Sequence, residues 1–229
     1  MPMHIGLIGG IGPAATVFYY ERIVRAFAAA DEPLHLTIGH TGALTLSQNV
    51  AAGRANEQAE EFTRVARQLA AAGADTVVIT SMGGHFCAKK FAAQSPLPLI
   101  DGPTSVAEHL KQAGIRRIGV LGTRIVMDSH LYGALSDLEP VAPVGAELDQ
   151  VNEDYIAVAI AGEATGAQSA RLLAAGDALV RDQNAEAVLL GGTDLNLVFD
   201  GSDFDYPIID SAAVHVDAIV ARALADAAG

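Results

Sequence analysis

A serine and a histidine follow an apolar, β-branched stretch that is typical of a buried strand. The stretch is Thr76–Thr80, and the next residues read Ser81-Met-Gly-Gly-His85. A hydroxyl and an imidazole at one strand end can act as a nucleophile and its base, or as donors to a carboxylate. A serine that caps a helix, followed by a histidine on that helix, would give the same pattern. The sequence leaves both interpretations open.

The turn Gly191-Gly-Thr-Asp194 follows a second apolar stretch and carries similar groups. Thr193 offers a hydroxyl and Asp194 a carboxylate, although capping by Thr193 would explain the pattern equally well. Acid–base chemistry needs groups that can take and return a proton. The predicted catalytic residues are therefore Ser81, His85 and Asp194.

Glycine turns between strands and helices expose main-chain N–H groups, which bind anions at helix N-termini. The turn Gly9-Gly-Ile-Gly-Pro13 is of this kind, but it matches neither a dinucleotide site nor a phosphate loop. A tight turn without a ligand is the alternative. Such turns, together with nearby hydroxyl donors, give the predicted substrate-binding residues Gly10, Gly12, Gly83, Gly84, Thr123, Gly192 and Thr193.

Other reactive side chains lie near these turns. His40 stands at the end of the second predicted strand and is a further candidate for the rim of the site. Cys87 follows His85 by two residues, and a lone cysteine is more often buried and inert than reactive. The sequence does not decide whether either takes part. The remaining histidines are predicted to be surface or packing residues: His4, His35, His109, His130 and His215.

The composition excludes several classes of protein. Lys and Arg number 14 against 27 Asp and Glu, so the formal net charge is −13 and the pI is near 4.7. Binding to nucleic acid or to an anionic membrane surface would need a basic footprint. The single cysteine excludes an internal disulfide and a thiolate metal cluster. No secretory signal or membrane-spanning run is visible, so we expect a cytoplasmic protein.

Apolar, strand-like runs alternate with amphipathic, helix-like runs along the chain. Continuous apolar strands separated by helices are typical of a parallel sheet that helices cover on both faces. The predicted strands of the first half are His4–Gly9, Leu34–Ile38, Thr76–Thr80 and Pro98–Ile100. The predicted helices are Ala14–Ala30, Glu57–Ala72, Thr104–Gln112 and a last one over Ala212–Ala227.

The second half of the chain repeats the first. Ile5-Gly-Leu-Ile-Gly is echoed by Ile118-Gly-Val-Leu-Gly, and two further stretches recur in the same order. We predict two similar parallel-sheet α/β domains related by a pseudo-two-fold axis, with the site between them at the carboxyl ends of the strands. The first domain is predicted over residues 1–101 plus 211–229, because the last helix has no strand after it and packs back. The second is predicted over residues 102–210.

Four motifs are spread over nearly the whole chain: Gly6-Leu-Ile-Gly-Gly-Ile-Gly-Pro13, Gly73-Ala-Asp75, Gly119-Val-Leu-Gly-Thr123 and Pro207-Ile-Ile-Asp210. In order and spacing they resemble the aspartate/glutamate racemase superfamily, which includes aspartate, glutamate and hydantoin racemases, maleate isomerase and arylmalonate decarboxylase. The resemblance implies two similar α/β domains with the active site between them. It also implies a small carboxylate ligand and chemistry at its α-carbon without a cofactor, and we predict no metal site.

The chain departs from this family at both catalytic positions. Family members use two cysteines, one in each domain: one thiolate removes the α-proton and the other thiol returns a proton on the opposite face. Ser81 stands in place of the first cysteine and Gly192 in place of the second, whereas His85 is retained. No arginine between Leu34 and Gly53 matches the one that holds the distal carboxylate in aspartate racemases. Because a serine hydroxyl is a much poorer base than a thiolate, two-thiol racemisation is not expected.

Three functions are compatible with this departure. The first is a one-sided reaction, such as isomerisation, decarboxylation or elimination, with Ser81 or His85 and Asp194 as acid and base. The second is racemisation through other groups, with His85 or Cys87 in place of a thiol. The third is binding of a small carboxylate without catalysis, through a degenerate site.

The first predicted helix bears on how the chain assembles. Tyr19 and Phe27 lie on it beside few charged residues. If this apolar surface is exposed in a single chain, a second copy would cover it. We therefore expect a homodimer.

Overall fold

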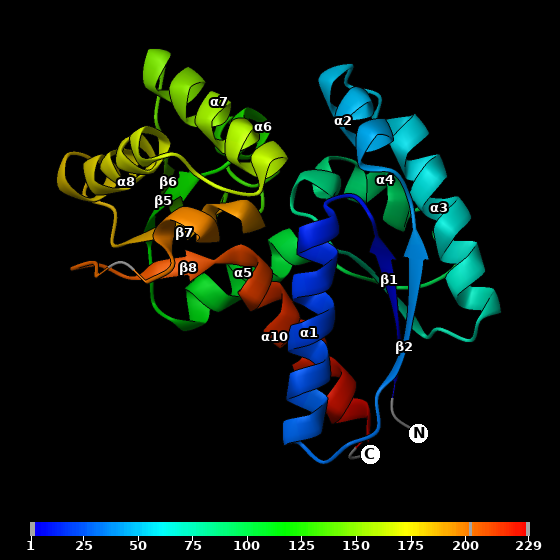
Figure 1. Cartoon of the computed structure of the whole chain (residues 1–229). Coiled ribbons are helices and arrows are strands. Elements are labelled where there is room, and N and C mark those ends of the chain that lie inside the picture. The colour runs from blue at the N-terminus through cyan, green and yellow to red at the C-terminus, as the bar shows by residue number, and fades with distance from the viewer. Residues whose placement is uncertain (1–2, 202, 228–229) are drawn as a thin grey trace. The chain divides into compact units, whose positions relative to one another are not determined.

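The computed structural model describes residues 3–201 and 203–227, and the chain divides into two compact units (Figure 1). Unit 1 comprises Met1–Ser105 and His215–Gly229, and unit 2 comprises Val106–Val214. The chain thus leaves unit 1 once and returns to it once. Both crossings lie four residues later in the chain than the boundaries predicted from the sequence.

A parallel sheet of four strands in the order β2-β1-β3-β4 forms the centre of unit 1. Its strands are β1 (His4–Gly9), β2 (His35–His40), β3 (Thr76–Ile79) and β4 (Leu99–Ile100). The helical elements are α1 (Pro13–Ala29), α2 (Ala43–Ala51), α3 (Ala55–Ala71), the 3₁₀ turn η1 (Gly83–Cys87), α4 (Ala88–Ala92), the start of α5 (Gly102–Gln112) and the greater part of α10 (Ser211–Ala227). Figure 1 shows α1 and α3 on opposite faces of β1 and β2. This cover explains why the central strands are apolar on both faces.

Unit 2 contains a second four-stranded parallel sheet, in the order β6-β5-β7-β8. Its strands are β5 (Arg117–Leu121), β6 (Glu139–Val141), β7 (Ala187–Leu190) and β8 (Ile208–Asp210). The helical elements are α6 (Arg124–Asp128), α7 (Ala146–Ala161), α8 (Gly166–Arg181), the 3₁₀ turn η2 (Thr193–Leu195) and α9 (Asn196–Phe199). Both sheets place their strands in the same sequence order, so the prediction of two similar parallel-sheet α/β halves is confirmed.

Local signals in the sequence set the ends of several helices. Pro13 is the first residue of α1, where its missing N–H breaks no helical hydrogen bond. Thr165 and Gln168 form a reciprocal capping box at the start of α8. Gly162 ends α7 in the left-handed conformation, with a φ of 72° that glycine adopts without strain. These signals position the helices that flank the strand ends.

The predicted elements did not include the helices α2, α7 and α8 or the strand β6. The short strand β6 contains Pro140, which cannot donate a hydrogen bond to a sheet. It is tolerated because β6 lies at the edge of its sheet, bonded only to β5 within the described sheet order. Because of Pro140, the sequence pattern did not indicate this strand, which adds only three residues to the sheet.

The condition on which the predicted homodimer rested, an exposed apolar surface at Tyr19 and Phe27, is not met. Both side chains are buried, because they share the inward face of α1 with Ile23 at helical spacing. The exposed apolar side chains of this helix are instead Val17 and Tyr20, which are 54% and 45% exposed.

Each unit has a hydrophobic core of its own. In unit 1 the Phe62 and Phe91 rings meet edge to face, with centroids 5.8 Å apart, beneath the sheet residues Val77 and Ile79. In unit 2 apolar residues of α7 and α8 pack on Val188 and Leu190 of β7. These cores hold the strand ends from which the candidate site is built. Of the helices in the described part of the chain, none has both the length and the apolarity to cross a membrane.

Candidate functional site

The residues predicted to bind or transform a ligand lie in turns at the carboxyl ends of strands. Within each unit the strands are parallel, so the carboxyl ends of neighbouring strands meet at one edge of the sheet. Unit 1 supplies the turns after β1 and β3, and unit 2 supplies those after β5 and β7. The two sets are described separately below.

His85 is held by main-chain groups on both sides of its ring. The Gly102 N–H donates to Nε2 at 3.1 Å, so the ring proton lies on Nδ1, which donates to the Ser81 carbonyl at 2.8 Å. The side chain is buried, and this burial lowers the pKa of His85. The imidazole is therefore neutral and fixes the turn that carries Ser81. A catalytic role for His85 stays a prediction, since both nitrogens already have partners.

A second buried histidine lies beside the first. His215 on α10 donates from Nε2 to the Ile100 carbonyl at 3.0 Å, and its Nδ1 accepts a hydrogen bond of 2.9 Å from the Tyr19 hydroxyl. The rings of His85 and His215 meet edge to face, with centroids 5.7 Å apart. Burial, aided by the neighbouring imidazole, lowers the pKa of His215 to about 3. These contacts agree with the packing role predicted for His215.

The turn after β1 uses part of its hydrogen-bonding capacity within the protein. The Gly10 N–H donates to the Thr16 hydroxyl at 3.0 Å, and the Gly12 carbonyl accepts from the same side chain at 3.1 Å. Gly10 has a φ of 84°, and the His40 ring lies where its side chain would be. His40 thus covers this turn, as a rim residue would. Ligand binding by Gly10 and Gly12 stays a prediction, and the Gly10 N–H would have to change partner.

Ser81 is half-buried at the end of β3, next to two glycines. The Gly84 N–H donates to the Ser81 carbonyl at 3.1 Å, which closes the turn. A side chain at Gly84 would approach Ile79 to 2.8 Å, so the turn needs glycine there to lie close to the strand. Gly83 is more open, with the Ser81 hydroxyl 3.6 Å from the position of its missing side chain. The sequence thus correctly placed Ser81, Gly83 and Gly84 at one strand end.

Cys87 is buried in the core of unit 1. Its thiol donates a weak hydrogen bond to the Gly84 carbonyl, with a sulfur–oxygen distance of 3.5 Å. Burial raises the pKa of the thiol to about 12, so it is not a thiolate near neutral pH. Cys87 is thus unsuited to replace a catalytic thiol.

In unit 2 the turns after β5 and β7 adjoin. A side chain at Gly122 would come within 3.5 Å of the Gly191 backbone, which brings Thr123 close to the second turn. The Thr123 hydroxyl is buried and has no partner among the described residues, so a donor or acceptor for it is still lacking. Thr193 and Asp194 are partly buried on the 3₁₀ turn that follows.

Tyr155 on α7 is a site residue that sequence reasoning missed. Its hydroxyl occupies the space where a side chain at Gly192 would begin, and it donates to the Asp194 carboxylate at 3.4 Å. Burial raises the pKa of Asp194, and it also raises the pKa of Tyr155. The available signal was Gly192 itself, because a missing side chain at a buried position implies that another group fills the space.

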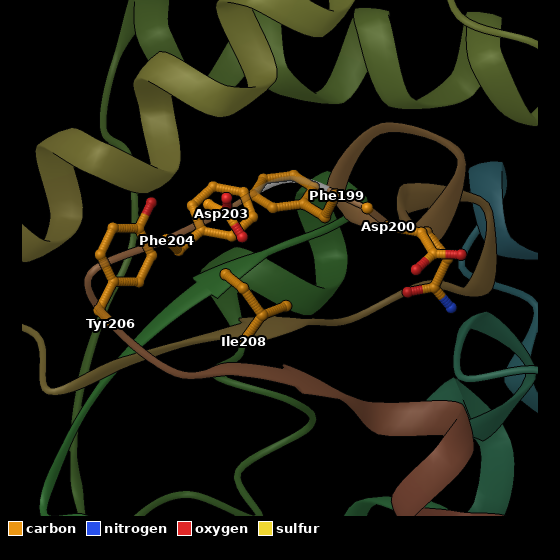
Figure 2. A pocket seen from close by; sticks show the side chains of 8 residues that line it. Phe199, Asp200, Asp203, Phe204, Tyr206 and Ile208 are labelled. Atoms are coloured by element: carbon orange, nitrogen blue, oxygen red, sulfur yellow. The ribbon is translucent and has the colours of Figure 1, made fainter.

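A pocket of unit 2 is lined by none of the predicted site residues. Figure 2 shows Phe199, Phe204 and Tyr206 along its wall, with Asp203 between the two phenylalanines and Asp200 at one end. It measures about 430 Å³, and none of the described residues that line it is basic. Aspartates repel an anion, so this pocket does not suit a small carboxylate. Among the described residues, no cluster of three His, Cys, Asp or Glu side chains could hold a metal ion.

Comparisons with known proteins identify the family of this chain and structures with a similar fold. The family profile described as Asp/Glu/hydantoin racemase matches residues 8–219. The structure of a candidate Asp/Glu racemase from Yersinia pestis is 27% identical, with a TM-score of 0.87 over 97% of this chain and 99% of that one. An aspartate racemase homologue from Pyrococcus horikoshii is 22% identical, with a TM-score of 0.80 over 96% and 99% of the two chains. The aspartate racemase of Picrophilus torridus is 20% identical, with a TM-score of 0.77 over 96% and 94%. The last two similarities concern the fold.

Proposed function

Because this chain belongs to the Asp/Glu/hydantoin racemase family, we propose that it catalyses cofactor-independent acid–base chemistry at the α-carbon of a small carboxylate. We further propose that the reaction is one-sided, such as an isomerisation, a decarboxylation or an elimination, instead of two-thiol racemisation. The substrate class is an amino acid or another 2-substituted acid.

The observation that carries this proposal is the filled space at Gly192. The Tyr155 hydroxyl stands where a second thiol-bearing side chain would begin, and Ser81 stands where the first would be. The one cysteine of the sequence, Cys87, is buried with a raised pKa. Thiols therefore cannot serve as the proton acceptor and proton donor on opposite faces of an α-carbon in this chain.

Asp194 is the side chain best suited to exchange a proton in this proposal. It is partly buried, and this burial raises its pKa, which makes it a better acceptor for an α-proton than an exposed carboxylate would be. We propose Ser81 from unit 1, and Thr123 and Thr193 from unit 2, as hydroxyl donors to the ligand carboxylate. The turns at Gly12, Gly83 and Gly192 remain proposed main-chain contacts of the ligand. We propose that His85 contributes by holding the Ser81 turn.

A second candidate function is binding of a small carboxylate without catalysis. The engagement of both His85 ring nitrogens by the main chain favours it, because an imidazole with two partners is not available as a base. The two functions differ in one observable. An enzyme exchanges the α-proton or transforms its ligand, whereas a binding protein does neither. NMR of each candidate acid with the protein in D₂O, over a panel of 2-substituted acids and dicarboxylates, distinguishes them.

Removal of single hydroxyls is expected to weaken ligand binding. Ser81→Ala and Thr193→Ala should each lower the affinity for a bound carboxylate by about 0.5–1.5 kcal/mol, or up to about 3 kcal/mol where the bond is to a charged group. Isothermal calorimetry with the same panel measures this. Ser136→Ala, which removes an exposed serine hydroxyl of unit 2, is the matched control and should bind as the wild type does. Unchanged affinity in both test variants would place the ligand elsewhere.

We also propose that the protein forms a homodimer. The exposed apolar side chains Val17 and Tyr20 on α1 support this, because a second copy would remove them from water. Sedimentation velocity at micromolar concentration should show a species of twice the 23.6 kDa chain mass. Tyr20→Lys should shift the population toward the single chain. A wild-type protein that sediments only as a single chain would contradict the assembly.

A further inference from the structure

Gly192 is a glycine for reasons of space. Its φ of −161° and ψ of 140° describe extended backbone that any residue adopts. A side chain there would instead overlap the hydroxyl end of Tyr155, whose Cζ lies 2.5 Å from the position of the missing Cβ. The identity of residue 192 is therefore coupled to Tyr155, which precedes Asp194 by 39 residues in the sequence.

An ion pair holds Tyr155 in this position. Its neighbour on α7, Asp154, is buried and accepts two hydrogen bonds from Arg171 of α8, at 2.6 and 2.7 Å. The Arg171 guanidinium holds the pKa of Asp154 below its ordinary value, so this carboxylate stays charged and paired. The bidentate pair fixes α7 against α8, and with it the depth at which Tyr155 reaches the end of β7.

The burial of the two partners differs. Tyr155 is buried, whereas Asp194 is only partly buried. The carboxyl group is therefore the member of the pair that a ligand can reach, and the phenol supports it from the protein side. We propose, on the basis of the proposed function, that Tyr155 is a positioning residue: its hydroxyl fills the space left by Gly192 and orients the Asp194 carboxyl group, which unit 2 presents to a small carboxylate substrate in place of a thiol.

The hydrogen bond from Tyr155 to Asp194 would stabilise the carboxylate that forms when Asp194 gives up a proton. When Asp194 gives its proton to a carbanionic α-carbon, its O–H bond breaks and a C–H bond forms from the carbanion's electron pair. The O–H electron pair stays on the carboxylate, where the Tyr155 hydroxyl donates a hydrogen bond to the new charge. In the reverse direction the carboxylate takes the α-proton.

Few other ionisable groups act on this pair. Burial raises the pKa of Asp194, and hydrogen bonds from its own main-chain N–H and then from Tyr155 offset part of that rise. The nearby Tyr132 contributes to the raised pKa of Tyr155. On α7, Asp154 is neutralised by Arg171 and Glu153 is exposed. The other helix that packs on this turn, α9, carries no ionisable side chain. A substitution of Tyr155 should therefore change the pKa of Asp194 with little interference from other ionisable groups.

The test is a titration of the Asp194 carboxyl carbon by ¹³C NMR in protein labelled at aspartate, with Asp194→Asn to assign the signal. Tyr155→Phe keeps the ring and removes the hydroxyl, so the pKa of Asp194 should rise by about half a unit to one unit. Tyr206→Phe is the matched control, because it removes a hydroxyl that donates to Asp177 at 2.8 Å. It should leave the Asp194 pKa unchanged.

Gly192→Ala provides a second, independent variant. The added methyl group displaces the Tyr155 hydroxyl without altering the phenol, so it should raise the pKa of Asp194 in the same direction. It is also the variant to measure if Tyr155→Phe does not fold. A merely structural Tyr155 would change the unfolding midpoint but leave the Asp194 titration where it is. An Asp194 pKa that neither variant moves overturns the inference.

These titrations need no substrate, so their outcome is separate from that of the proposed function. If the Asp194 pKa responds to Tyr155 but no acid in the panel is bound or exchanged, the pair stands and the proposed reaction fails. If an acid is turned over while the Asp194 pKa ignores Tyr155, the reaction stands and the positioning role fails.

Discussion

Aspartate and glutamate are expected to keep their α-protons when incubated with this protein in D₂O. A general acid or base at the reacting atom contributes about 10²–10⁴-fold to a rate, and here neither expected thiol is present. The exchange rate should therefore lie at least about 10²–10⁴-fold below that of a two-cysteine racemase. Proton NMR of the α-position, followed by chiral analysis of the amino acid, measures both exchange and inversion.

The physical reason lies in the acidity of the two kinds of group. An α-proton next to a carboxylate is very weakly acidic, and a thiolate is a far better base for it than a neutral hydroxyl. The imidazole nearest in sequence, His85, is not a base for the Ser81 hydroxyl, because its Nδ1 donates to the Ser81 carbonyl and its Nε2 accepts from Gly102. A two-cysteine glutamate racemase in the same assay is the positive control. Rapid wash-in of deuterium with inversion would show that other groups have replaced the thiols.

The folded protein should lose stability as the pH falls from 7.5 to 4.5, because two buried histidines must remain neutral in it. His215 has a pKa near 6.5 in the unfolded chain and about 3 in the folded one, and burial lowers the pKa of His85 as well. Between these pH values the unfolded state binds more protons, so the free energy of unfolding falls as the pH falls. At about 1.4 kcal/mol per unit, His215 alone should account for a loss of about 3 kcal/mol between pH 7 and 4.5.

Urea denaturation at pH 7.5, 6.5, 5.5 and 4.5 measures this loss. His215→Gln keeps a donor for Ile100 and an acceptor for Tyr19, so it should fold with a shallower dependence on pH. His109→Gln, which removes an exposed imidazole, should keep the wild-type dependence. The raised pKa of Asp194 acts in the opposite direction, so it offsets part of the loss that the histidines cause. A free energy of unfolding that stays level from pH 7.5 to 4.5 would contradict the prediction.

Much of the fold could be predicted because its signals are local. The run His4–Gly9 is apolar and ends in glycines, and it forms β1 over the same residues. The helical spacing in Glu57–Ala72 matches α3 to within two residues. Where tertiary packing decides the outcome, the local signal was insufficient: Pro140 concealed an edge strand, and nothing in the sequence showed that Tyr19 is hydrogen-bonded to His215 of α10.

The candidate site was less accessible to sequence reasoning. Ser81 and Asp194 follow strands directly, so their positions at strand ends could be predicted from the pattern alone. Tyr155 lies in the middle of a helix, with no turn or glycine beside it to mark a site. Its role depends on a contact with Gly192 that only packing creates. The partners of His85 were hidden for the same reason, because Gly102 belongs to a different element.

The position of α10 has a consequence for the order in which the molecule matures. Tyr19 and His215 are 196 residues apart in the sequence, yet they are hydrogen-bonded in unit 1. A ribosome synthesises all of unit 2, Val106–Val214, before His215 appears. Unit 2 can thus complete its core first, while the surface of unit 1 that later packs against Ile219 and Ala223 of α10 stays open. The half of the molecule that is synthesised first is therefore the half that completes its folding last.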